Sequence, residues 1–231
     1  MTVREILEGC KQAIILLLSF DQEVYSIIFL SLYVSLMATF FATLLAIPVG
    51  ILLGIKDFQW KNIVIRFVYT LMSLPPVIAG LVVFLLISRK GPFGFLGLVY
   101  TPTAMIIAQT CLVIPIITGI VYNGTKEKGK TVQILAKTLG ADSRHTLLLL
   151  MKELRIDILT GIVTGYGRAV SEVGAVMIVG GNIKGHTRVM TTTITMLQSM
   201  GNYEMAIALG MVLLGISFTV NTILYYYQRG E

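Results

Sequence analysis

The sequence predicts an all-α membrane protein with about five transmembrane helices and an N-terminal interfacial helix. Of its 231 residues, 55% are hydrophobic and only 13% are charged, and the mean hydropathy is +0.83. So few charged side chains cannot cover the surface of a soluble domain, whereas apolar runs of about 20 residues match the thickness of a bilayer. Short basic segments separate these runs, as in proteins that cross a membrane several times.

The net charge of +6 does not indicate a nucleic-acid-binding protein. The basic residues gather between apolar runs instead of along one face, which favours the positive-inside rule over a phosphate-binding surface. The two cysteines, Cys10 and Cys111, lie about 100 residues apart and fit neither a disulfide framework nor a metal site. We expect Cys111 to be a small buried hydrophobic residue.

The N-terminal part of the chain predicts one interfacial segment and one long span. Residues 1–20 hold a single short apolar run, so we assign residues 1–23 to an interfacial segment and 24–231 to the transmembrane domain. Residues 24–55 carry no charge, and a helix of this length measures about 48 Å against about 30 Å of hydrocarbon. The first span is therefore tilted, kinked near Pro48, or extended into water.

The second predicted span, residues 67–88, is interrupted by Pro75 and Pro76. Two consecutive prolines remove two backbone donors and break the helix. The carbonyl groups freed in this way need partners from neighbouring helices, which places the break inside a bundle. A loop rich in Gly and Pro (89–102) then leads to the third predicted span, residues 103–122.

Two further spans follow the hydrophilic segment 124–157. The fourth, residues 158–183, is long enough to cross but contains Arg168 and Glu172. A polar connection, residues 184–204, precedes the last span, residues 205–227, which ends in three tyrosines and Arg229. Such an aromatic and basic end is typical of a membrane boundary.

The segment 124–157 cannot lie in lipid, because it holds seven Lys and Arg residues. Apolar spacing predicts a helix over residues 132–139, and Gly140 stands where a helix end needs positive φ. Asp142 or Ser143 can cap a second helix with its body at 146–154. We interpret the two short helices hinged at Gly140 as a docking surface.

The charge distribution predicts the orientation of the chain. With segment 124–157 in the cytoplasm, the inner side holds about eleven Lys and Arg residues and the outer side about six. Five spans then place the N-terminus outside and Glu231 in the cytoplasm.

One segment matches a nucleotide-binding motif in sequence but lacks the structural context that the motif needs. Residues 124–131, GTKEKGKT, match the phosphate-loop pattern G-x-x-x-x-G-K-[ST]. That loop must follow a buried strand in an α/β domain, whereas here the match follows a membrane span. We therefore interpret it as a lysine-rich turn.

Two candidate sites come from polar residues within or near the spans. Arg168 and Glu172 are four residues apart, and ionisable groups inside a membrane must face protein or water. They form either a structural ion pair or part of an anion path. In segment 181–193, Lys184, His186 and Arg188, with neighbouring threonine hydroxyls, can donate to an oxyanion. The alternative is a solvated surface loop.

The hydrophilic segment resembles that of bacterial ATP-binding cassette importer permeases, whose pattern is E-A-A-x-x-x-G-x9-I-x-L-P. Gly140 matches the glycine, Ala136 the second alanine and Leu150 the aliphatic position. The chain departs from the pattern at three places: Ile134 replaces the glutamate, Leu135 replaces the first alanine, and Lys152-Glu153 replaces Leu-Pro. The resemblance implies a type I importer fold and an ATPase-docking loop made by Ile134, Leu135, Ala136, Leu139, Gly140, Ala141 and Leu150.

Two other blocks, starting at MSLPPVIAGLVVF and GRAVSEVGAVMIV, resemble tungstate importer permeases, which are related to the molybdate ones. This resemblance implies a homodimer, a pair of separate ATP-binding subunits, and an external substrate-binding protein. ATP and Mg would bind to the partner subunit, and this chain would hold no cofactor and catalyse no reaction. From the polar residues and the proline break described above, we expect the translocation path to include Arg168, Glu172, Pro75 and Pro76, and the outer oxyanion mouth to include Lys184, His186 and Arg188.

The alternative from another class is a secondary transporter for a small anion. That mechanism needs an internal inverted repeat and ionisable groups for coupling. An odd number of spans and a single intramembrane acid argue against it.

Overall fold

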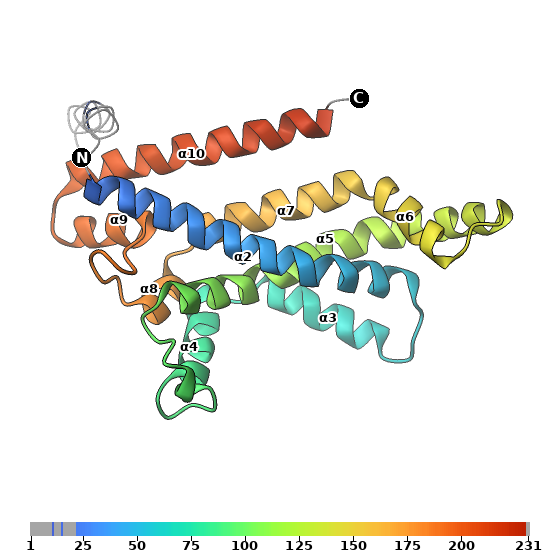
Figure 1. Ribbon diagram of the computed structural model, residues 1–231, viewed down its shortest axis with the longest axis horizontal. Helices are drawn as coiled ribbons and strands as arrows, with labels where there is room; N and C mark the ends of the chain where they lie inside the picture. The colour runs from blue at the N-terminus through green and yellow to red at the C-terminus, as the bar shows by residue number, and fades with distance from the viewer. Residues whose placement is uncertain (1–10, 12–14, 16–21, 230–231) are drawn as a thin grey trace.

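The computed structural model describes residues 11, 15 and 22–229, and the regular structure within that part of the chain is entirely helical. Three helices run along the long axis of the molecule, α2 (Gln22–Ile55), α5 (Pro102–Thr138) and α10 (Tyr203–Arg229) (Figure 1). Each is long and apolar enough to cross a membrane. The predicted all-α membrane fold is therefore confirmed, while the predicted interfacial segment falls almost wholly outside the described residues.

Helix α2 packs closely against α5 through small residues. Its 34 residues span about 51 Å and include Pro48. Ala38, Ala42 and Ala46 are buried at four-residue spacing, and a Cβ added to Gly54 would lie 2.4 Å from Thr125. Small side chains let two helix backbones approach each other, which is how helices associate in lipid.

The third predicted span is much longer than expected. Helix α5 continues without a break to Thr138, so the segment predicted as a loop from residue 124 begins with the last turns of α5. The separate helix predicted at 132–139 is therefore wrong. The reason is that single glycines such as Gly124 and Gly129 weaken a helix by only about 1 kcal/mol each and do not end it. At about 55 Å, α5 exceeds the bilayer by about 25 Å.

Cys111, on the same helix, is exposed and not buried as predicted.

Two spans are broken into bent pairs of helices. The first pair is α3 (Lys61–Met72) and α4 (Pro76–Ile87), bent by 102°, which confirms the break predicted at Pro75 and Pro76. The second pair is α7 (Arg155–Val170) and α8 (Gly174–Gly180), bent by 58°. The span predicted over residues 158–183 corresponds to this bent pair. At the bend, the Glu172 carboxylate accepts the Ala175 amide of the new helix at 3.0 Å.

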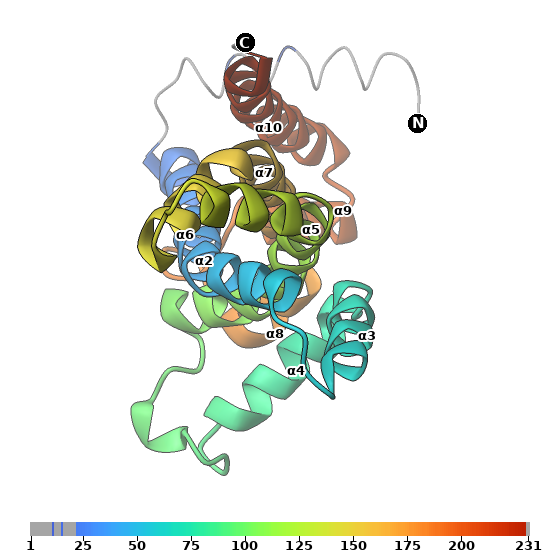
Figure 2. The same ribbon diagram turned by 90° about the vertical axis from the view of Figure 1, so that its right-hand side faces the viewer.

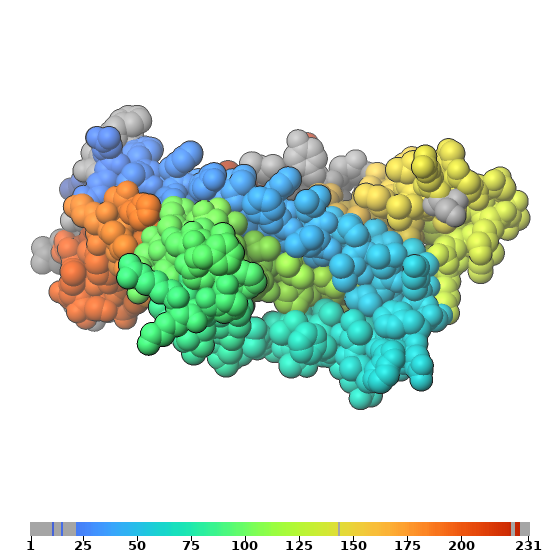
Figure 3. All heavy atoms as spheres, turned by 60° about the horizontal axis from the view of Figure 1, so that its bottom comes forward, coloured from blue at the N-terminus to red at the C-terminus, as the bar shows by residue number. Residues whose placement is uncertain are grey.

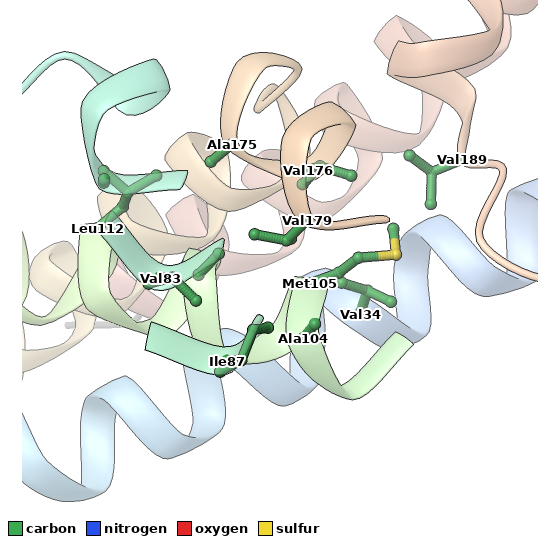
Figure 4. Packing of buried hydrophobic residues seen from close by; sticks show 12 residues of the cluster. Val34, Val83, Ile87, Ala104, Met105, Leu112, Ala175, Val176, Val179 and Val189 are labelled. Atoms are coloured by element: carbon green, nitrogen blue, oxygen red, sulfur yellow. The ribbon is translucent and has the colours of Figure 1, made fainter. Parts of the chain in front are cut away.

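The two short helices α4 and α8 pack against each other and against the start of α5 (Figure 4). Figure 4 shows Val83 and Ile87 on one side of this cluster, with Val176 and Val179 facing Met105. The contact is close, since a Cβ on Gly80 would lie 2.5 Å from the Ala175 Cα atom. The short 3₁₀ helix η1 (Gly94–Leu96) lies in the loop between α4 and α5.

The polar connection predicted over residues 184–204 contains a helix, α9 (Met190–Ser199). Hydrogen bonds hold its start in the bundle: the Met190 amide donates to Ser31 Oγ at 2.7 Å, and Thr191 Oγ1 donates to the Glu172 carbonyl at 2.9 Å. The buried positions at the start of α9 are threonines, so the sequence there lacks the apolar spacing that would have predicted a helix. Helix α10 follows at the edge of the bundle beside α7 (Figure 2), and its first half packs on α2 and α9 through Ala208 and Val212.

Helix α6 (Ser143–Glu153) and the end of α5 form a lobe at one end of the long axis, coloured yellow in Figures 1 and 3. Leu150 and Leu154 anchor this lobe, since both are fully buried in a cluster with residues of α2 and α5. The lobe therefore belongs to the same core as the spans.

Candidate functional site

The elbow between α5 and α6 is built around Gly140. Its φ is +75°, which confirms the predicted positive value. The Gly140 amide donates to the Lys137 carbonyl at 3.0 Å and the Ala141 amide to the Ala136 carbonyl at 2.9 Å. These two bonds satisfy carbonyl groups at the end of α5 and fix the direction in which the chain leaves it.

Asp142 starts the second helix of the elbow. Its carboxylate accepts from the His145 amide at 2.8 Å and lies 2.7 Å from the His145 ring nitrogen. Of the two caps that the sequence allowed, the structure uses this one. The His145 backbone amide and ring hold the pKa of the Asp142 carboxyl below its ordinary value.

The residues predicted to dock an ATPase fall into two groups. Ile134, Leu135 and Leu139 are exposed, and Leu139 is 82% accessible. Ala136 and Leu150 are buried, so they position the elbow and do not present a surface. Helix α6 also exposes apolar side chains that the sequence analysis did not single out, namely Leu147, Leu148, Leu149 and Met151. The run of four leucines at 147–150 was the signal that could have indicated them.

Residues 124–131, which match the phosphate-loop pattern, lie inside helix α5. Helical amides in this stretch are already bonded along the helix, so they cannot wrap a phosphate group. The nucleotide-binding interpretation is therefore excluded by the local backbone.

Arg168 and Glu172 meet at the break between α7 and α8. Arg168 Nη2 lies 3.5 Å from Glu172 Oε2, and the Glu172 side chain is 3% exposed. On the same face of α7, hydroxyl side chains point outward from exposed positions; they are Thr160, Thr164 and Ser171. The face thus carries polar groups, whereas the exposed face of α2 is apolar, with Phe29, Leu36 and Phe40.

The break after α7 lies against the start of α4. A Cβ on Gly174 would lie 2.8 Å from Val77 Cγ2 and 3.6 Å from Glu172 Oε1. The structure therefore brings the Pro75–Pro76 break close to the Arg168–Glu172 pair, although about 100 residues of sequence separate them.

At the opposite end from the elbow, Lys184 and Arg188 converge on Glu23. Lys184 Nζ lies 2.8 Å from Glu23 Oε2, and Arg188 Nη1 lies 4.0 Å from Glu23 Oε1. These side chains line a cavity of about 510 Å³, and His186 is not among the lining residues. Sequence reasoning missed Glu23, because no local signal links it to a loop 160 residues away.

The threonine hydroxyls predicted near this mouth bond within the protein. Thr187 Oγ1 donates to the Gly180 carbonyl, Thr191 Oγ1 to the Glu172 carbonyl at 2.9 Å, and Thr192 Oγ1 to Asn182 Oδ1 at 2.9 Å. All three side chains are buried. Their predicted role as donors to an oxyanion is therefore wrong, because their protons already stabilise the fold.

Comparison with known proteins completes the description of the site. Residues 46–230 match the family described as binding-protein-dependent transport system inner membrane component. The chain is 53% identical to a tungstate uptake system permease protein of Peptoclostridium acidaminophilum, over 97% of this chain and 98% of the relative. It is 37% identical to a tungstate uptake system permease protein of Campylobacter jejuni, over 97% and 94%, and 26% identical to a molybdenum transport system permease protein of Haemophilus influenzae, over 71% and 75%.

These matches cover the spans, the two breaks and the elbow together. The chain therefore belongs to the family of inner-membrane components of binding-protein-dependent transport systems, and is a multi-pass permease subunit of an ATP-binding cassette importer.

Proposed function

We propose that this chain carries tungstate across the membrane into the cytoplasm, driven by ATP hydrolysis on a separate subunit. The observation that carries the proposal is the elbow lobe, which projects beyond the spans and exposes a cluster of apolar side chains. Two relatives that cover nearly the whole chain are tungstate uptake permeases, which supports tungstate as the transported anion. Relatives named for molybdenum and sulfate transport are more distant.

The ATPase docks on the exposed face of the elbow. Leu139 and Leu148 have no bilayer to cover them there, because α5 extends about 25 Å beyond the hydrocarbon. An exposed apolar patch of this kind outside the membrane is typical of a protein interface. Arg144 and Lys152, on the same helix, add a basic rim for an acidic partner surface.

The permease works as a homodimer with its pore lined by α7. Thr160, Thr164 and Arg168 recur at four-residue spacing, so they share one face of the helix. Polar groups at membrane depth must face protein or water. A second copy on this face encloses a polar path in which Arg168 meets the passing anion, while Glu172 limits how tightly the anion is held. The paired breaks at Pro75–Pro76 and Glu172 let these spans bend.

The opposite end receives the anion from an external binding protein. Lys184 and Arg188 provide two positive charges, of which Glu23 neutralises one. The remaining positive charge attracts an oxyanion without holding it. With the elbow inside the cell, this end is extracellular, the N-terminus lies outside and the C-terminus lies in the cytoplasm, in accord with the excess of basic residues around the elbow.

Uptake by reconstituted liposomes tests the proposal. The chain is combined with its ATPase subunit and binding protein, and labelled tungstate, molybdate and sulfate are offered in turn. We expect uptake of tungstate that depends on ATP and on both partners. Uptake by the chain alone, driven by an ion gradient, would instead support a secondary transporter.

A further inference from the structure

An ion pair joins α5 to the start of α7 near the elbow. Lys128 Nζ on α5 lies 2.9 Å from Asp157 Oδ2 in the first turn of α7. Gly124 lies one helical turn before Lys128, and a Cβ on it would be 2.5 Å from the Asp157 Cγ atom. The carboxylate therefore rests directly on the α5 backbone, and any side chain larger than hydrogen at position 124 would displace it.

The position of Asp157 strengthens this contact. The carboxylate lies in the first turn of α7, where the helix dipole favours a negative charge. The side chains of Lys128 and Asp157 are 35% and 25% exposed, so water screens the pair less than it screens a fully exposed one. The geometry therefore holds the end of α5 and the start of α7 in one fixed relation.

This contact lies between the docking surface and the polar face of α7. Asp157 is only four residues after Glu153, the last residue of α6, and three before Thr160, the first exposed hydroxyl of the proposed pore. Helix α6 itself packs mainly on α5 and touches α7 little. Further along, α5 and α7 also pack through Gly161 and Gly165 against Ile117. At the start of α7, a displacement of α6 reaches the helix through the short chain connection and through the contact of Asp157 with α5.

We infer that Gly124, Lys128 and Asp157 form a latch that makes α5, α6 and the start of α7 move as one body, so that displacement of the elbow by the ATPase tilts the pore helix. Lys128 and Asp157 are positioning residues in this account. Without the latch, movement of the elbow is absorbed by bending at the start of α7, and ATP is hydrolysed with less transport. The inference depends on the proposed function, since it assigns the route of coupling within it.

The test measures labelled tungstate transported per ATP hydrolysed by the complete reconstituted transporter. Asp157→Asn and Lys128→Met remove one charge each, and Gly124→Ala displaces the carboxylate without changing any charge. We expect each variant to retain the ATPase and to lower the ratio by about two- to thirty-fold, the range in which single residues alter coupling between sites. Lys128→Arg keeps the pair and should keep a ratio close to that of the wild type.

Two matched variants serve as controls. Gly210→Ala adds a methyl group to a helical glycine with nothing within 4 Å of the new atom. Asp57→Asn removes an ion pair of the same 2.9 Å length, between Asp57 and Lys61, outside the latch. Both should leave the ratio unchanged.

The outcomes separate the latch from the proposed function. Wild-type ratios in Asp157→Asn and Lys128→Met would overturn the latch while leaving the transport function intact. Loss of ATPase binding or of assembly in all three latch variants would also overturn it, because the contact would then be structural only. A wild-type complex without ATP-dependent tungstate uptake would instead contradict the proposed function.

Discussion

Arg168 Nη2 lies 3.5 Å from Glu172 Oε2, while the other oxygen of Glu172 accepts the Ala175 amide at 3.0 Å. One buried carboxylate thus serves both an ion pair and the start of α8. The proposed role of the pair in the anion path and a purely structural role predict different results for a neutral replacement.

The double variant Arg168→Met with Glu172→Gln separates these interpretations. Glutamine keeps an oxygen for the Ala175 amide, and replacing both members of a buried pair with neutral residues is often tolerated by the fold. We expect a folded protein whose tungstate uptake falls at least about tenfold, which corresponds to about 1.4 kcal/mol. Uptake and thermal stability are measured on the same preparation. Uptake at the wild-type level would assign the pair a structural role.

Replacing Gly140 should uncouple ATP hydrolysis from transport. A side chain at φ +75° costs about 1–2 kcal/mol for an ordinary L residue, and a β-branched one is particularly strained, so Gly140→Val should distort the elbow. No atom lies within 4 Å of an added Cβ, which means that the effect is one of backbone conformation. Gly140→Asn is the control, because asparagine tolerates this conformation. Normal uptake by Gly140→Val would argue against the elbow as a coupling element.

Leu150 and Leu149 are neighbours with opposite environments. Leu150 is fully buried between α6 and the core, whereas Leu149 is exposed. Leu150→Ala should therefore destabilise the lobe by about 2–5 kcal/mol, while Leu149→Ala should change stability by no more than about 0.5 kcal/mol. Hydrogen exchange of the α6 amides measures both. Equal protection in the two variants would show that Leu150 does not anchor the lobe.

The cap of α6 should be sensitive to acid. The pKa of Asp142 in the folded protein is below the ordinary 3.8, so the ionised carboxylate stabilises the helix. That stabilisation is complete above pH 3.8 and is lost as the pH falls below it, through the lower pKa of the folded state. Hydrogen exchange at residues 144–147 should lose protection in this acid range in the wild type. Asp142→Asn, which can cap without titrating, should show no such step.

Much of this fold could be predicted from local signals. The bounds of α2 and α10 follow from uncharged apolar runs, and the break before α4 follows from Pro75 and Pro76, because proline acts on its own backbone. The positive φ of Gly140 and the Asp142 cap also depend only on neighbouring residues. Local chemistry determines these features, so the sequence alone was sufficient for them.

The features that could not be predicted depend on distant partners. Helix α9 begins where the Met190 amide donates to Ser31 Oγ, 159 residues away, and the second break packs against Val77 of α4, about 100 residues away. The pairing of Lys184 with Glu23 and of Lys128 with Asp157 likewise needs the folded arrangement. Neither hydropathy nor spacing contains that information. The length of α5 could not be predicted from charge, because Lys and Glu residues exclude a segment from lipid but do not end a helix.

The proposed function requires an ATPase subunit to bind this permease through the exposed apolar face of the elbow. Leu139 in the elbow and Phe95 at the tip of the loop between α4 and α5 are both 82% exposed, so changing either to aspartate alters the surface and not the core. The deciding measurement is the amount of ATPase that co-purifies with each variant in detergent. We predict that wild type and Phe95→Asp retain it in equal stoichiometry and that Leu139→Asp loses most of it. Full retention by Leu139→Asp, or loss caused only by Phe95→Asp, would contradict the account.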